Sequence, residues 1–321
     1  MLSRTADSLF WLARYTERAE NVARILSAGH RMASLTRSVG SAGNEWESTL
    51  AATGCAESYR VRHAEITSEG VIDFLVRDPE NPSSILSCLE TARRNARAVR
   101  TALTVDMWES LNETWLQLRS FEPKTDSGDQ LSSFLEWVKQ RSLLFNGAYA
   151  NTMLRNDAFY FTQLGTYLER ADNTARILDV KYHVLLPQGD RVGGPLDYLQ
   201  WESILRGVSA LRAYHWVYHE RLAPWMIADL LILRSEMPRS LAACTAQIAH
   251  YLERLADGYG GERGECHRRA GELDARLRYG RIDAIFPSGL HEFLTRFIDD
   301  GCALGRDISE FYLLGRAACG C

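Results

Sequence analysis

Near its start the chain places a carboxylate, an amide and a guanidinium at helical spacing, as Glu17, Asn21 and Arg24. Residues three or four positions apart lie above one another on a helix, so these side chains are within reach of each other. The same residue types return 152 positions later, and in both copies an arginine directly follows the glutamate. The candidate catalytic and binding residues of this pattern are Glu17, Arg18, Asn21, Arg24, Glu169, Arg170, Asn173 and Arg176.

Two kinds of chemistry suit this pattern. A glutamate whose pKa is shifted by its surroundings can act as a general acid or base, which makes Glu17 and Glu169 the candidate catalytic residues. Networks of glutamate and arginine are also common structural elements, and such a network would fix how two central helices meet. Both interpretations stay open from the sequence.

The element that carries the pattern is a long helix that occurs twice. Residues 8–26 read SLFWLARYTERAENVARIL, and residues 160–178 repeat much of this text as YFTQLGTYLERADNTARIL. On a helix, apolar residues cover more than half of the circumference, which is typical of a helix at the centre of a bundle. We therefore expect the polar face to be at least partly covered and to satisfy its own hydrogen bonds.

The repeat extends beyond this helix. The triplet WES at 46–48 returns at 201–203, and Ser84 has a match in Ser240. Because the offset is the size of a domain, a solenoid of short repeats is not indicated. The sequence therefore predicts a duplicated helical bundle whose two parts are related by a pseudo-twofold axis.

The fold class is predicted to be all-α, because long alternating runs of β-branched residues are missing. The two helical repeats are expected at 1–155 and 156–321, packed as one unit. The predicted helices are Ser3–Leu35, Asn44–Tyr59, Thr67–Arg77, Ser83–Leu103, Asp106–Phe121, Gln130–Leu154, Asp157–Leu186, Leu196–His219, Pro224–Ser235, Pro238–Asp257, Arg263–Leu277 and Leu290–Arg316.

Five motifs spread over the chain carry a family resemblance. They are YTERAEN at 15–21, ENPSSI at 80–85, ARRNARAVR at 92–100, WESLN at 108–112 and YLERADNTARILD at 167–179. Together they resemble the alpha-E family, a bacterial all-helical family called after its Glu-Arg motif. The resemblance implies genes that stand beside those for circularly permuted ATP-grasp ligases and transglutaminase-like proteins. These two are the expected protein partners, and they suggest peptide or amide-bond metabolism.

One arginine cluster occurs only in the first half. Arg93, Arg97 and Arg100 lie at i, i+4 and i+7 of a predicted helix and so share one face. Arginine is suited to a bidentate grip on carboxylate or phosphate, which makes these residues a candidate site for an anionic small molecule or peptide. The alternative is a solvated face, or a partner for the chain's own glutamates.

Composition excludes several function classes. The net charge is −4 with 37 basic and 41 acidic residues well mixed, so we expect no nucleic-acid face. Neither a signal peptide nor a membrane span is apparent, and no membrane partner is expected. The seven cysteines are odd in number and widely scattered, which favours reduced thiols and a cytoplasmic location.

Metal and cofactor motifs are weak. His215 and His219 have a spacing able to hold a metal, but no second ligand pair accompanies them. The pair in Cys319-Gly320-Cys321 makes a poor site by itself. We therefore expect no metal and no cofactor.

We interpret the chain as an accessory or substrate-presenting protein that works with an ATP-grasp amide or peptide ligase. One alternative is an enzyme that acts on a peptide or amide, with Glu17 or Glu169 as acid or base and the arginine cluster as its anion site. Another is a structural dimerisation scaffold.

Overall fold

The structure is a computed structural model that describes residues 1–38, 45–120, 128–183 and 194–313. The described residues form helices joined by short connections and contain no strand, so the predicted all-α class is confirmed. The helices are α1 Ser3–Ser38, α2 Glu45–Ala52, α3 Ala56–Arg62, α4 Ser68–Val76, α5 Ile85–Ala98, η1 Arg100–Ala102, α6 Val105–Ser120, α7 Gly128–Thr152, α8 Asp157–His183, α9 Pro195–Gly207, α10 Leu211–Tyr218, α11 Pro224–Ile232, α12 Leu241–Gly258, α13 Glu265–Arg278, α14 Ile282–Ile285, α15 Leu290–Ile308 and η2 Ser309–Leu313.

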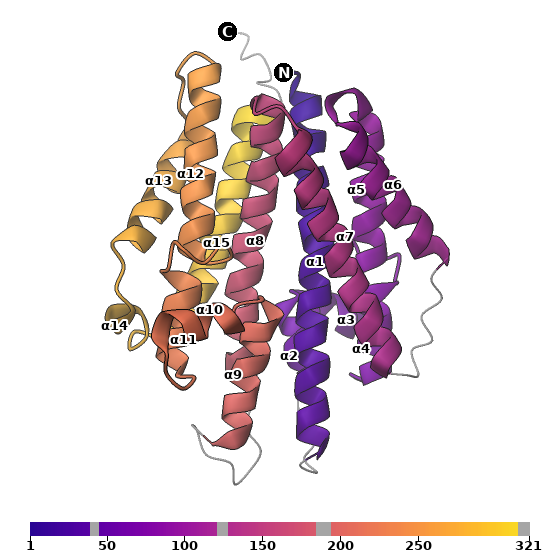
Figure 1. The fold of residues 1–321 in the computed structure, drawn as a ribbon, viewed down its shortest axis with the longest axis vertical. Helices are drawn as coiled ribbons and strands as arrows, with labels where there is room; N and C mark the ends of the chain where they lie inside the picture. Colours follow the sequence, from indigo (N-terminus) through magenta and orange to yellow (C-terminus); the bar gives the residue numbers. More distant parts are fainter. Residues whose placement is uncertain (39–44, 121–127, 184–193, 314–321) are drawn as a thin grey trace.

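The repeated helices, α1 and α8, run side by side through the middle of the molecule (Figure 1). Helices α5, α6 and α7 lie on one side of this pair, and α12, α13 and α15 lie on the other. The wide apolar arcs seen in the sequence explain this place, because Leu9, Leu12 and Leu164 are fully buried. Burying a side chain of this size contributes about 1.5–3 kcal/mol, so the central pair anchors the bundle.

Small residues let the two central helices approach closely. A methyl group on Gly165 of α8 would lie 2.2 Å from the carbonyl oxygen of Phe10 in α1 and 3.2 Å from the Cβ of Ala13. Any side chain at this position would push the helices apart. Gly165 therefore sets the distance at which side chains from α1 and α8 can bind each other.

Two predicted helices are each broken in two. The segment predicted at 44–59 divides at Gly54, and the segment predicted at 196–219 divides at Ser209. Both residues have a left-handed backbone, with φ of 69° and 59°, which an α-helix cannot contain. The predicted helix ends at Asn44, Phe121, Leu186 and Arg316 lie outside the described residues.

Several local features occur once in each half. Ser84 and Ser240 cap α5 and α12, and each accepts a hydrogen bond from the backbone NH three residues later. The hydroxyls of Tyr59 and Tyr214 each donate to a loop carbonyl. The pseudo-twofold axis and the division at residue 155 stay predictions.

None of the described helices is long and apolar enough to cross a bilayer.

Candidate functional site

Where α1 crosses α8, the two helices exchange glutamate–arginine pairs. Arg170 of α8 donates two hydrogen bonds to Glu17 of α1, from Nε at 3.0 Å and from Nη2 at 2.9 Å. In return Arg18 of α1 donates two to Glu169 of α8, at 2.5 and 3.0 Å. Both glutamates are buried, with 1% and 4% of their surface exposed. We call this pair of reciprocal contacts the Glu-Arg crossing.

The order of residues in the sequence explains the exchange. Neighbouring residues on a helix point about 100° apart. With the glutamate directed at the partner helix, the arginine after it lies at the edge of the contact, and its long side chain reaches across to the other glutamate. A planar guanidinium matches a carboxylate with two parallel hydrogen bonds, which explains why arginine serves this position better than lysine.

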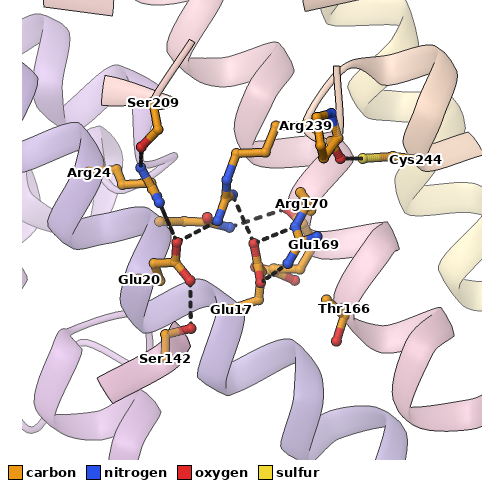
Figure 2. A network of polar contacts seen from close by, with 12 residues as sticks. Glu17, Glu20, Arg24, Ser142, Thr166, Glu169, Arg170, Ser209, Arg239 and Cys244 are labelled. Carbon is orange, nitrogen blue, oxygen red and sulfur yellow. Dashed lines mark hydrogen bonds and ion pairs between the residues drawn. The ribbon is translucent and has the colours of Figure 1, made fainter. Parts of the chain in front are cut away.

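A second arginine joins Glu17 from a distant part of the chain. Arg239, in the turn before α12, donates to Glu17 at 2.9 Å and to Glu20 (Figure 2). Glu20 also binds Arg24 at 2.7 Å and accepts a hydrogen bond from Ser142 of α7 at 2.5 Å. Two carboxylates and three guanidiniums, counting that of Arg170, therefore interlock on this side of the crossing.

Glu169 has a different second partner. Arg14 donates to Glu169 Oε2 at 2.8 Å, and its guanidinium also lies over the ring of Trp11 at 4.9 Å. Asn21 donates from Nδ2 to the backbone carbonyl of Glu169 at 3.3 Å. Each glutamate of the repeated motif is thus held by two guanidiniums, but these come from different elements.

The surroundings keep both glutamates ionised. Burial by itself would raise the pKa of Glu17, but the guanidiniums of Arg170 and Arg239 outweigh it and lower the pKa to about 2. Burial opposes the guanidiniums of Arg18 and Arg14 in the same way at Glu169, whose pKa also falls to about 2. Neither carboxyl group is poised to give or take a proton near neutral pH.

A pocket of about 220 Å³ lies beside Glu169. Its partly exposed rim includes Arg18, Asp172 and Arg176, and Asn21 and Asn173 lie in its buried part. Asn21 Oδ1 and both side-chain polar atoms of Asn173 have no hydrogen-bond partner among the described residues. Buried polar atoms without partners are rare, so this pocket is the best candidate for a ligand site.

The predicted contact along each helix, from glutamate through asparagine to arginine, does not form. Arg24 binds Glu20 instead of Glu17, and Arg176 binds Asp172 at 2.7 Å instead of Glu169. The reason is that Glu17 and Glu169 point across the helix interface, while the residues three positions later stay beside their own arginines. The predicted role of the network in fixing how the central helices meet agrees with this geometry.

The arginine cluster of the first half is not one helical face. Helix α5 ends at Ala98, so the prediction of a continuous helix through Leu103 was wrong, and Arg100 lies in the 3₁₀ turn that follows. Arg93 donates to Asn112 Oδ1 at 3.0 and 3.1 Å, and Arg97 is exposed. The remaining member, Arg100, stacks on Trp108 at 4.8 Å.

The candidate residues chosen from the sequence leave out three members of the site, namely Arg14, Glu20 and Arg239. A comparison of the halves contained a signal for one of them, because Arg239 precedes the cap Ser240 whereas Ser83 precedes the matching cap Ser84. Among the described residues no group of three or more histidine, cysteine or acidic side chains has the arrangement of a metal site. The segment Cys319-Gly320-Cys321 lies outside the described residues.

These features define an all-helical protein built on two central helices that exchange glutamate–arginine pairs. The sequence profile of Alpha-E, described as a predicted alpha-helical domain with a conserved ER motif, matches residues 1–313, and the chain belongs to this family. Glu17-Arg18 and Glu169-Arg170 are the two Glu-Arg pairs of the repeated helix, and they are the ones that meet at the crossing.

Uncharacterized proteins of Mycobacterium bovis and Mycobacterium tuberculosis are similar to the chain, each with 22% identity over an alignment 339 positions long. The alignment covers 96% of this chain but only 36% of each relative, so the chain spans about a third of their length. No solved structure gives a significant match.

Proposed function

We propose that the protein is a binding protein that holds a small polar ligand at the Glu-Arg crossing and presents it to an ATP-grasp amide or peptide ligase. The observation that carries the proposal is the pocket beside Glu169, where buried amide atoms of Asn21 and Asn173 have no partner among the described residues. A ligand that pairs these atoms would recover the cost of leaving them unpaired, about 1–3 kcal/mol each.

Binding suits this site better than acid–base catalysis. With a pKa of about 2, Glu17 and Glu169 stay ionised near neutral pH, and each is held by two guanidiniums. Such groups hold a position or a charge well, but a general acid or base needs a pKa close to the working pH. The enzyme alternative therefore receives no support from the geometry of these two residues.

The ligase partner comes from the resemblance, and two observations are consistent with a partner. The mycobacterial relatives are nearly three times as long as the matched region, so in them this region is only one part of a larger protein. Arg97 is exposed, which leaves its charge available to a partner. A cytoplasmic location, where ATP is present, and a transglutaminase-like protein as second partner belong to the same proposal.

The test combines the purified protein with the ATP-grasp ligase encoded beside a family member. We expect a complex in analytical size exclusion and a rise in ligase ATP turnover. Arg97→Glu should weaken the complex by about fivefold or more, because reversing a charge at an interface rim slows association and strengthens repulsion. Arg94→Glu, on another face of α5, is the matched control and should behave as wild type. Absence of a complex, together with unchanged ATP turnover, would overturn the proposal.

A further inference from the structure

The two halves differ at the residue before matching helix caps. Ser84 caps α5 and Ser240 caps α12 with the same hydrogen bond to the NH three residues later. The residue before Ser240 is Arg239, and the residue before Ser84 is Ser83. One half therefore extends a guanidinium from this turn, and the other half has only a hydroxymethyl group there.

The guanidinium of Arg239 occupies a defined position between two carboxylates. It donates to Glu17 and to Glu20, and its side chain is 10% exposed. Across the crossing, the sequence repeat matches Glu17 with Glu169 and Glu20 with Asp172. Glu169 and Asp172 both line the pocket, and the short serine of the other turn lies at its rim. The pocket is thus the counterpart of the position that Arg239 fills.

Glu17 and Glu169 each accept three hydrogen bonds from guanidiniums, but these are divided differently between the two carboxylate oxygens. Glu17 Oε1 accepts from Arg170 at 3.0 Å and from Arg239 at 2.9 Å. Over the described ranges, Glu169 Oε1 accepts only from Arg18, at 2.5 Å. The third hydrogen bond to Glu169 comes from Arg14 at Oε2. Glu169 Oε1 is therefore the oxygen that keeps room for another donor, on the side where the first half has Ser83 in place of Arg239.

Two amide oxygens add to this acceptor set. Asn21 Oδ1 and Asn173 Oδ1 line the pocket without partners among the described side chains, and the two residues are only 5% and 2% exposed. A guanidinium offers five N–H donors in a plane and no acceptor, which matches a group of oxygens. The unpaired Nδ2 of Asn173 would bind an oxygen of the same ligand or a water.

The arginines of the pocket do not argue against a cation. Arg18 and Arg176 are already paired with the carboxylates of Glu169 and Asp172. On the side that Arg239 fills, Arg170 and Arg24 are paired with carboxylates in the same way. Arg14 also pairs with Glu169, so the guanidinium of a ligand would be the fourth on the pocket side, and it would be held by the two amide oxygens as well as by the carboxylates.

We propose that the pocket binds the guanidinium group of a small ligand, with Glu169 and Asp172 taking the parts that Glu17 and Glu20 play for Arg239. The volume of about 220 Å³ exceeds what one water needs, about 10–15 Å³, by a wide margin and admits a guanidinium with part of its alkyl chain. This inference rests on the proposed function, in that it names the chemical class of the ligand held at the crossing.

The first test is calorimetric titration of the full chain, without ligase, with agmatine, and with methylurea and inorganic phosphate as uncharged and anionic probes. We expect agmatine to bind at one site per chain and the other two not to bind. Free arginine and a short arginine peptide carry the same guanidinium group, so both are titrated as well. The one with the higher affinity tells whether the natural ligand is an amino acid or a peptide. The proposal would be overturned if phosphate binds and agmatine does not, or if none of the three probes binds.

The second test uses variants of the two turns. Ser83→Arg should place a guanidinium in the pocket and weaken agmatine binding by about tenfold or more. The control is Ser58→Arg, which adds the same charge on the exposed face of α3 and should leave agmatine binding unchanged. Arg239→Ser should lower the melting temperature of the protein, and adding agmatine should restore part of the loss. This variant should also bind two agmatine molecules per chain, because the position of Arg239 becomes a second site. If Arg239→Ser does not fold, the result for Ser83→Arg tests the proposal alone. Agmatine binding by Ser83→Arg at wild-type strength would refute the assignment of the pocket.

The two proposals fail separately. Agmatine binding without any ligase complex would remove the ligase partner and keep the ligand class. A ligase complex formed by a protein that ignores agmatine would keep the partner and remove the ligand class.

Discussion

Replacing Glu17 by glutamine tests the Glu-Arg crossing with the smallest change of shape. Glutamine keeps the size, the helix propensity and one acceptor oxygen, but it removes the charge that faces Arg170 and Arg239. The side chains of these arginines are 14% and 10% exposed, so water does little to compensate either. Breaking a buried pair by removing one partner costs about 3–5 kcal/mol.

The pKa of Glu17 supports the direction of this change. The guanidiniums of Arg170 and Arg239 outweigh the effect of burial and lower this pKa, so they stabilise the ionised carboxylate that glutamine lacks. The direction agrees with the cost of breaking a buried pair, and we expect Glu17→Gln to lose about 3 kcal/mol or more in the free energy of unfolding.

Urea unfolding followed by far-UV circular dichroism measures this loss as a shift of the midpoint at constant slope. The matched control is Glu47→Gln, because Glu47 and its partner Arg60 are both about half exposed, at 50% and 56%. An exposed pair of this kind contributes under about 1 kcal/mol. A Glu17→Gln variant as stable as Glu47→Gln would refute the claim that the crossing is a closed network.

Three further predictions follow from the same contacts. Glu169→Gln should lower the free energy of unfolding less than Glu17→Gln does, because Arg18, the partner of Glu169, is 24% exposed at the pocket rim and can reach water. Equal urea midpoints for the two variants would count against this. Because the folded-state pKa values of Glu17 and Glu169 are lowered, their contribution is complete above the unfolded value of 4.5 and is lost as the pH falls toward 2. Unfolding midpoints should therefore drop between about pH 5 and pH 3 in wild type and drop less in Glu17→Gln. Gly165→Ala should destabilise by about 1–3 kcal/mol, since its methyl group would meet the carbonyl oxygen of Phe10; a neutral effect would show that the helices can separate freely.

The sequence predicted the central helices well because their apolar arcs are wide and occur twice. The helix end at Ala98 was not predictable in the same way, since neither glycine nor proline marks it, and Arg100 was therefore placed on the wrong element. The break at Ser209 is similar, because a serine with positive φ carries no signal in the sequence.

The partners in the site depend on tertiary structure that spacing along a helix cannot show. Asn21 and Arg24 lie at helical spacing from Glu17, but Glu17 points across the interface and binds Arg170. Its other partner, Arg239, lies 222 positions away and reaches it only because α12 packs against α8. What the sequence could have shown is the asymmetry between the halves, since the residue that matches Arg239 is a serine.

We propose that Arg239 fills one side of the crossing and that the pocket on the other side is open to the guanidinium of a ligand. A crystal structure of the wild-type protein in agmatine tests it most directly. We predict a planar guanidinium bound to Glu169 Oε1 and Asp172, with Arg239 still bound to Glu17 and Glu20. A pocket that instead holds an anion between Arg18 and Arg176, or that is closed over by its own side chains, would contradict the account.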